Sequence, residues 1–204
     1  MTTRIQREFT FQAGVYYDSQ FLMNIYEISL CIDVETDSLR EQNIAMERIS
    51  FFLSEYLENG IFVEETEKKV IEKYLASDFK VCTLPAEPYD QIISVMLLLK
   101  LNAITEGRFL VTDISLTSKL SDGVSYLHEI GGASGPFATP GWWDDTCASM
   151  TNLEKLNKKE KIVKLFRTHT SDWAEFNLSW KEKTPKLIIP DQAEISFEKL
   201  PEQL

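Results

Sequence analysis

Histidine and cysteine are scarce in this chain, which has 2 His and 3 Cys among 204 residues. No two of them lie at the short spacing of a protein-built zinc site, so we expect no metal and no cofactor. Cys31, Cys82 and Cys147 are widely separated, which gives no disulfide framework and is typical of a reducing compartment. We therefore expect a cytoplasmic protein.

Cations and long apolar runs are also lacking. Lys and Arg total 21 against 32 Asp and Glu, a net charge of −11 at pH 7. Docking on nucleic acid or on anionic lipid requires clustered cations, so we expect neither partner. The longest apolar stretch, residues 92–99, is interrupted by Ser94 and is far shorter than the roughly 20 residues that span a membrane. The first seven residues show no apolar segment of a secretory signal.

Alternating apolar and polar residues dominate the first part of the chain. Residues 4–17 and 21–35 both follow this pattern, and a period of two indicates strands. The turn residues 18–20 between them predict a long antiparallel hairpin. One face of such a hairpin must be covered by helices.

Three helices are predicted to follow the hairpin. Ser38 and Glu41 form a capping box at the start of the first, which we expect to end before Gly60. A short charged helix is predicted over residues 64–76. The third, over 88–106, is apolar on nearly all sides and is the expected central helix of the core.

Extended segments surround and follow the third helix. Residues 79–85 are extended by composition, and 108–120 and 124–130 form a second hairpin through the turn Asp122-Gly123. Beyond residue 130 the chain becomes rich in Gly and Pro and contains Trp142-Trp143.

The change of character after residue 130 sets the predicted domain organisation. We expect a domain of residues 1–130 and a C-terminal extension of residues 131–204. Within the extension, 152–167 has a helical pattern and 173–180 has the pattern of a strand.

Two short stretches resemble the tunnelling-fold family of 6-pyruvoyl tetrahydropterin synthase and 6-carboxy-tetrahydropterin synthase. They are Phe-Thr-Phe-Gln-Ala at 9–13 and Pro-Tyr-Asp-Gln-Ile at 88–92, and the order of predicted elements is also similar. The resemblance implies an α+β fold: a four-stranded antiparallel sheet with helices on one face, here followed by the C-terminal extension.

The family's three zinc-binding histidines have no counterpart here. The corresponding places read Gly-Val-Tyr-Tyr at 14–17 and Tyr-Glu-Ile at 26–28, which offer no nitrogen or sulfur ligand. The family's Asp-His pair is absent too, because Phe-Lys-Val-Cys at 79–82 occupies that region. The resemblance therefore implies the scaffold without the zinc chemistry.

The resemblance also implies a carboxylate that binds the N–H edge of a pterin or purine. Asp113 on the third long strand, or Glu106 just before it, is the candidate. Arg108, Asp90 and Gln91 lie at the two ends of the apolar helix and complete a candidate ligand site. Arg108 paired with a neighbouring carboxylate, and Asp90 at the helix N-terminus, would equally be structural.

Two further features have a functional and a structural interpretation. Trp142-Trp143 could stack a flat ligand or anchor a partner, or their loop could fold back and close a core. His128 is a candidate ligand-binding residue and could activate Cys82 as a nucleophile; otherwise Cys82 is a small buried side chain and His128 a surface residue.

Two functions remain open on the sequence alone. The first is a homo-oligomer, closed into a ring or barrel through exposed sheet edges, that binds a small flat heterocycle at a subunit interface and could be a metal-free enzyme. The second is a catalytically inactive interaction or structural module on the same scaffold.

Overall fold

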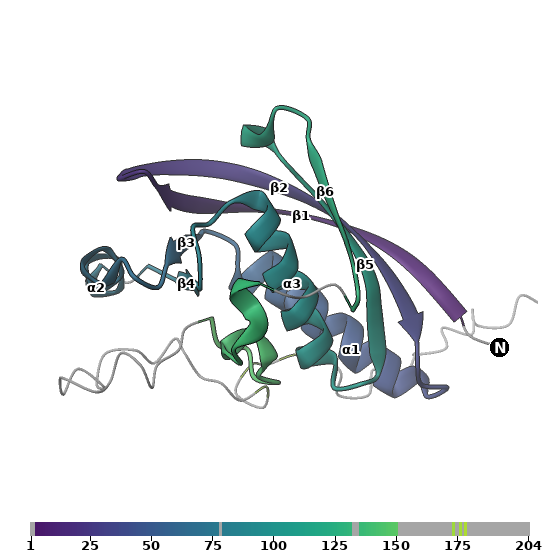
Figure 1. Cartoon of the computed structure of the whole chain (residues 1–204). Helices are drawn as coiled ribbons and strands as arrows, with labels where there is room; N and C mark the ends of the chain where they lie inside the picture. Colours follow the sequence, from purple (N-terminus) through teal and green to yellow (C-terminus); the bar gives the residue numbers. More distant parts are fainter. Residues whose placement is uncertain are drawn as a thin grey trace, which may run out of the picture.

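A long antiparallel hairpin is the largest element of this computed structural model, which describes residues 3–77, 79–131 and 135–150 with Trp173, Phe176 and Leu178 (Figure 1). Strands β1 (Thr3–Tyr17) and β2 (Gln20–Val34) pair along their whole length, with Thr3 opposite Val34 and Tyr17 opposite Gln20. The hairpin predicted from the alternation of residues is confirmed.

Six strands form one sheet in the order β4-β3-β1-β2-β5-β6. Strand β3 (Gly60–Glu64) runs parallel to β1, and β4 (Val81–Leu84) runs parallel to β3. On the other side, β5 (Phe109–Ser118) is antiparallel to β2, and β6 (Ser125–Glu129) is antiparallel to β5. The fold is therefore α+β with a mixed sheet.

The four strands expected from the sequence are present and antiparallel, as β1, β2, β5 and β6. The expectation of a four-stranded antiparallel sheet is nevertheless incomplete, because β3 and β4 add two parallel strands. Residues 60–63 and 81–84 are buried without alternation, because parallel strands covered on both faces carry apolar side chains on both sides. Gly60 does not simply end a helix: a Cβ there would lie 2.9 Å from the Leu57 carbonyl oxygen. The glycine lets the chain enter β3 directly from the preceding helical turn.

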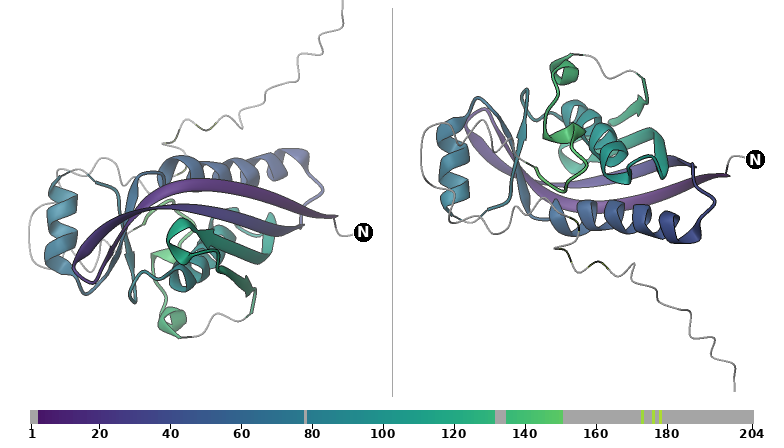
Figure 2. Two further views of the ribbon diagram at one scale, coloured as in Figure 1. Left: turned by 90° about the horizontal axis from the view of Figure 1, so that it is seen from above. Right: turned by 90° about the horizontal axis from the view of Figure 1, so that it is seen from below.

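Helices α1 (Leu39–Phe51) and α3 (Asp90–Thr105) cover one face of the hairpin, as the two views of Figure 2 show. The Ser38 half of the predicted capping box is confirmed, since its side chain accepts a hydrogen bond from the Glu41 amide. The reciprocal half is not formed, because the Ser38 amide donates to the Thr36 hydroxyl and the Glu41 carboxylate pairs with Arg108. A π-helical turn (Phe52–Tyr56) continues α1. The buried side chains of β1, β2, α1 and α3 form a single apolar core.

The third helix lies on the opposite face of the sheet, so the expectation of helices on one face is incomplete. Helix α2 (Lys68–Ala76) packs Ile71 against Ile61, Val63 and Val81 of β3 and β4. Its partners are the alternate residues of the same two strands whose other side chains face the main core. This second cover explains why β3 and β4 are buried on both faces.

A buried lysine in α3 holds the chain that follows the sheet. Lys100 is 0% exposed, and its ammonium donates to the carbonyl oxygens of Trp142, Asp145 and Cys147 at 2.8, 2.7 and 2.5 Å. Burial lowers the pKa of Lys100 to about 8, against the opposing effect of the nearby Asp145 carboxylate. Three carbonyl acceptors compensate the ammonium for the water it loses.

The same segment covers the outer edge of β4. The Thr83 amide donates to the Met150 carbonyl oxygen at 3.2 Å, and the Trp142 indole N–H donates to the Thr83 carbonyl oxygen at 2.8 Å. Short 3-10 turns (Pro136–Ala138 and Trp142–Asp144) place Phe137, Trp142 and Trp143 in the main core.

The described part of the predicted extension thus packs with the sheet and helices of residues 3–131. The predicted helix at 152–167 lies outside the described residues, as does most of the predicted strand at 173–180. None of the described helices is long and apolar enough to cross a membrane.

The three hydrogen bonds of the buried Lys100 ammonium predict a large loss of stability when the ammonium is removed. Lys100→Met keeps the length of the side chain but leaves buried carbonyl groups without a donor, so we expect a loss of about 3 kcal/mol in the free energy of unfolding. Urea denaturation at pH 7 measures it. Lys69→Met, at an exposed lysine of α2, should change stability by less than about 0.5 kcal/mol. Equal effects of the two substitutions would contradict the stabilising role of the Lys100 hydrogen bonds.

Candidate functional site

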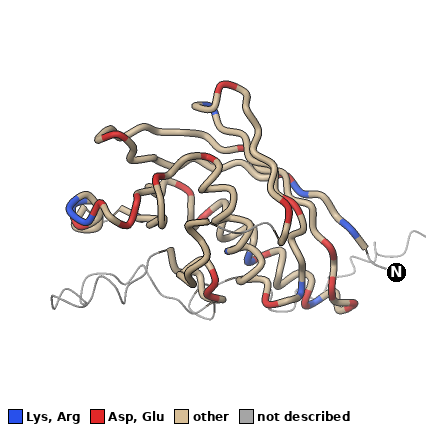
Figure 3. Tube along the Cα trace, in the orientation of Figure 1, with Lys and Arg blue, Asp and Glu red and all other residues tan. Residues whose placement is uncertain are grey.

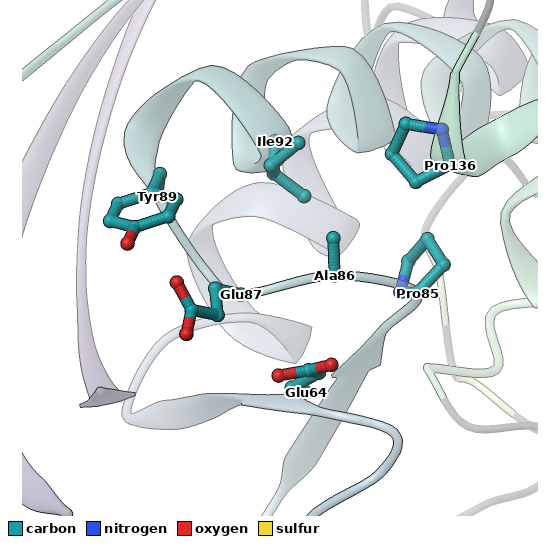
Figure 4. Close-up of a pocket in the computed structure, with 7 residues that line it drawn as sticks. All are labelled: Glu64, Pro85, Ala86, Glu87, Tyr89, Ile92 and Pro136. Atoms are coloured by element: carbon teal, nitrogen blue, oxygen red, sulfur yellow. The ribbon is translucent and has the colours of Figure 1, made fainter. Parts of the chain in front are cut away.

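An open surface depression of about 560 Å³, called the cavity below, lies where β3 and β4 end and α3 begins (Figure 4). Its lining comes from the end of β3, the β4–α3 connection, the first residues of α3 and one proline of the later loop: Glu64, Pro85, Ala86, Glu87, Tyr89, Ile92 and Pro136.

The parallel pairing of β3 and β4 creates this site. Because parallel strands end at the same edge of a sheet, Glu64 at the end of β3 lies beside the chain that leaves β4 at Leu84. The Glu65 amide donates to the Leu84 carbonyl oxygen at 2.8 Å, and this bond holds the chain that follows β3 beside the end of β4. Pro85 and Pro88 then flank Glu87 before the first turn of α3.

Carboxylates give the cavity its chemical character. Glu64 and Glu87 both line it, and Figure 4 shows the Glu87 carboxylate directed toward the Tyr89 hydroxyl while Ile92 and Pro136 lie on the other side. None of the described residues that line it is cationic. Figure 3 shows further acidic residues along the chain around the end of β3. The cavity therefore favours ligands that bring N–H donors or positive charge.

Tyr89 joins the cavity to the tip of the β1–β2 hairpin. Hydrogen bonds to the Glu87 carboxylate and to Tyr17 raise the pKa of Tyr89 above its ordinary value. The two phenol oxygens lie 3.2 Å apart, and the ring centroids of Tyr17 and Tyr89 lie 5.1 Å apart. Tyr89 remains 48% exposed, so its ring offers a surface on which a flat molecule could stack.

Glu106 and Arg108 lie at the opposite end of α3 from this cavity, in an ion-pair network. Glu106 Oε2 is 2.9 Å from Arg48 Nη1 and 2.5 Å from Arg108 Nη1, and Arg108 Nε is 2.6 Å from Glu41 Oε2. Burial tends to raise the pKa of Glu106, but the hydrogen bonds from Arg108 and Arg48 outweigh it and lower this pKa. The Glu106 carboxylate, a candidate ligand-binding group in the sequence analysis, is thus already paired with two arginines.

Asp90 and Gln91 lie in the first turn of α3, next in sequence to Tyr89 but outside the lining of the cavity. The Ser118 hydroxyl donates to Asp90 Oδ2 at 2.5 Å. Burial raises the pKa of Asp90, against this hydrogen bond. Asp90 therefore ties α3 to the end of β5, while the side chain of Gln91 is exposed.

Asp113 and His128 lie on β5 and β6, away from the cavity lining. The Thr112 hydroxyl donates to Asp113 Oδ2 at 2.6 Å, at the position where β5 shifts register against β2. His128 is partly buried, and this burial lowers its pKa. His128 does not meet Cys82, because β6 and β4 are at opposite edges of the sheet. Burial in the core also raises the pKa of the Cys82 thiol.

Trp142 and Trp143 are 3% and 2% exposed. The Trp143 ring packs edge-to-face on Phe137 with centroids 5.1 Å apart, and the Trp142 indole is held by Thr83. Neither ring presents a face to solvent. Trp142 and Trp143 therefore have the structural role given as the second interpretation in the sequence analysis, in which their loop folds back and closes a core.

Glu64, Glu87 and Tyr89 were not among the candidate residues of the sequence analysis. The sequence signal that could have led to them is the pair of short apolar segments at 60–63 and 81–84. Such segments are typical of neighbouring parallel strands. Among the described residues, no group of three or more His, Cys, Asp or Glu side chains is placed to hold a metal ion.

Comparison with known proteins gives only distant structural similarities. No family model and no curated protein matches the chain. It is similar to an uncharacterized protein, WS1659, from Wolinella succinogenes at 9% identity and a TM-score of 0.41, covering 64% of this chain and 99% of that one. It is also similar to 6-pyruvoyl tetrahydropterin synthase from Plasmodium vivax at 12% identity and a TM-score of 0.40, with the same coverage. Similarity at this level assigns no activity to the chain.

The lowered pKa of Glu106 predicts a pH-dependent contribution to stability. A carboxyl group with a lowered pKa stabilises the fold above its ordinary pKa, and this contribution disappears as pH falls through the folded-state value. Glu106→Gln should therefore cost about 1 kcal/mol at pH 7, since its partial exposure weakens the ion pairs. The difference from the unsubstituted protein should shrink between pH 5 and 3, as urea denaturation at several pH values would show.

Glu72→Gln is the matched control, because Glu72 is exposed on α2. It should leave the pH profile of stability unchanged. A Glu106→Gln variant whose stability differs from that of the unsubstituted protein by the same amount at pH 3 and pH 7 would contradict the role of the ion pairs.

Proposed function

We propose that this chain binds a small flat heterocycle of the purine or pterin type in the cavity between β3, β4 and α3. The observation that carries the proposal is the presence of two carboxylates, Glu64 and Glu87, in one open cavity of about 560 Å³, with no cation among the lining residues that the structure describes. Ile92 supplies an apolar wall, and Tyr89 supplies an aromatic ring at the rim (Figure 4).

The recognition chemistry follows from the ionised carboxyl group. Its two oxygens only accept hydrogen bonds, so they match an edge with two neighbouring N–H donors. A guanine or pterin ring presents such an edge through its ring N–H and exocyclic amine, whereas adenine presents an amine beside an acceptor nitrogen. Charge-assisted bonds of this kind are about twice as strong as neutral ones. The proposed ligand class is therefore heterocycles that carry an amino group beside a ring N–H, as guanine and pterin do.

The negative charge of the cavity also sets what the ligand should lack. A phosphate group close to Glu64 and Glu87 would be repelled, and the described lining residues include no lysine or arginine to compensate its charge. A free base or nucleoside is accordingly favoured over a nucleotide.

This proposal keeps the ligand class expected from the sequence but moves the site. The earlier candidates Glu106 and Asp113 each contact a neighbouring side chain away from the cavity. Asp90 and Gln91 remain near the proposed ligand through their place in the first turn of α3. Conversion of the ligand without a metal is a further part of the proposal, and analysis of the ligand recovered after incubation tests it.

The alternative, an interaction module without a ligand, is favoured by the apolar side chains exposed at the hairpin tip. Tyr17, Phe21, Leu22 and Met23 all lie there with substantial exposure. The two functions differ in one measurable respect, because a ligand that binds only the folded state raises the melting temperature.

We expect pterin and guanosine to raise the melting temperature of the protein, and adenosine and guanosine monophosphate to raise it less. Glu64→Gln and Glu87→Gln should each weaken binding about tenfold, because each removes a charge-assisted acceptor. Titration calorimetry measures these affinities, and chromatography of the recovered ligand detects conversion.

Glu72→Gln, on the exposed side of α2, should bind the same ligands with unchanged affinity. Absence of any thermal shift with the donor-edge heterocycles would reject the ligand proposal and favour the interaction module. Binding that is insensitive to both cavity substitutions would reject the assigned site.

A further inference from the structure

Among the described residues, strand β6 has no sheet partner along its outer edge. It is the last strand of the sheet, next to β5 alone. The Ile130 amide donates to the Thr112 carbonyl oxygen of β5 at 2.8 Å. Backbone groups of successive residues in an antiparallel strand alternate between the two sides. Ser125, Leu127 and Glu129 therefore direct their N–H and C=O groups away from β5, toward the open edge.

The side chains along this edge are unusually apolar for an exposed strand. Leu127 is 65% exposed, and Val124 and Ile130 at the two ends of the strand are exposed as well. Residues 125–129 contain no Lys and no Pro, the residues with which natural proteins protect open edges from pairing. Glu129 is the one Asp, Glu, Lys or Arg residue of this strand. The edge is thus suited to pairing with another strand.

The opposite edge of the sheet consists of β4 and of residues 3–11 of β1, which lie beyond the three β1 residues paired with β3. The β1 part carries the charged side chains Arg4, Arg7 and Glu8, of the kind that oppose pairing at an edge.

The β4 part of this edge is already covered. Thr83 in the middle of β4 already gives its amide to Met150 and receives the Trp142 indole at its carbonyl oxygen. Lys100 fixes this covering segment through the Trp142, Asp145 and Cys147 carbonyl groups. Head-to-tail pairing of β6 with β4 of the next copy, which would build a ring, would have to displace these bonds.

The sequence of β6 is complementary to itself in the antiparallel direction. With Leu127 opposite its own copy, Ser125 faces Glu129 and Tyr126 faces His128. Val124 then faces Ile130 in the same register, so exposed apolar side chains meet each other and no two like charges are opposed. The residues that would share hydrogen bonds, 125, 127 and 129, are those whose backbone groups point to the open edge. Backbone direction and side-chain chemistry thus agree on one register.

We propose that β6 pairs antiparallel with β6 of a second copy of this chain about a two-fold axis at Leu127. The two sheets then join into one continuous sheet across the dimer, and the symmetric contact closes after two copies. This arrangement differs from the ring or barrel expected from the sequence. It leaves the cavity of Glu64 and Glu87 independent, so the dimer does not rest on the proposed ligand.

The C-terminal residues that the structure describes lie elsewhere. Trp173 and Phe176 pack against Phe51 near the end of α1, with the Phe51 and Phe176 ring centroids 4.6 Å apart. Figures 1 and 2 show β6 on the other flank of α3 from α1. The described part of the extension therefore does not occupy the β6 edge.

Sedimentation of the full chain tests the proposal directly. We expect a reversible dimer of twice 23.5 kDa that tightens at higher salt, because two copies of net charge −11 repel each other. Leu127→Lys should give a monomer that retains its melting profile. Leu39→Lys, at another exposed leucine at the start of α1, should leave the dimer intact.

Disulfide trapping tests the register. Directly opposed residues of a hydrogen-bonded antiparallel pair lie about 5.5 Å apart between Cα atoms, a separation that a disulfide can bridge. Leu127→Cys should form a covalent dimer with oxidised glutathione well above the background of the three native cysteines, and Leu39→Cys should not. A monomeric unsubstituted chain, a trimer or larger ring, or a dimer unaffected by Leu127→Lys would overturn the proposal.

Discussion

The pairing of β1 with β2 over fifteen residues each is the constraint on which the rest of the structure depends. It creates one continuous apolar face, and α1 and α3 bury that face in a single core. Every other strand is added to this hairpin: β3 and β4 beside β1, and β5 and β6 beside β2. The two flanks differ in direction, and this difference separates the proposed ligand site from the proposed dimer edge.

The parallel flank carries the candidate site because of how parallel strands end. Glu64 and Glu87 come from segments more than twenty residues apart, and only the pairing of β3 with β4 brings them to one cavity. The antiparallel flank ends in a strand with free backbone groups and exposed apolar side chains. The outer edge of β4, by contrast, is covered by the segment that Lys100 and Trp142 hold in place.

The charged groups of α3 show how the same residue types can serve structure or recognition. Glu106 carries a carboxylate at a helix end, which made it a reasonable ligand for an N–H edge, but Arg48 and Arg108 already bind it. Lys100 lies in an otherwise apolar helix and gives no hint in the sequence of its partners, because they are backbone carbonyl groups of a distant loop. Such partners leave no pattern in a single sequence.

The sequence by itself determined the long hairpin, the capped first helix, the apolar central helix and the second hairpin, because each depends on a local period or a turn of known chemistry. It did not determine the parallel strands β3 and β4, since short buried segments show no alternation. Only the tertiary structure decided which carboxylates share a cavity, that Trp142 and Trp143 are buried, and which sheet edge stays open. These features arise from contacts between segments far apart in the chain, and local patterns carry no information about such contacts.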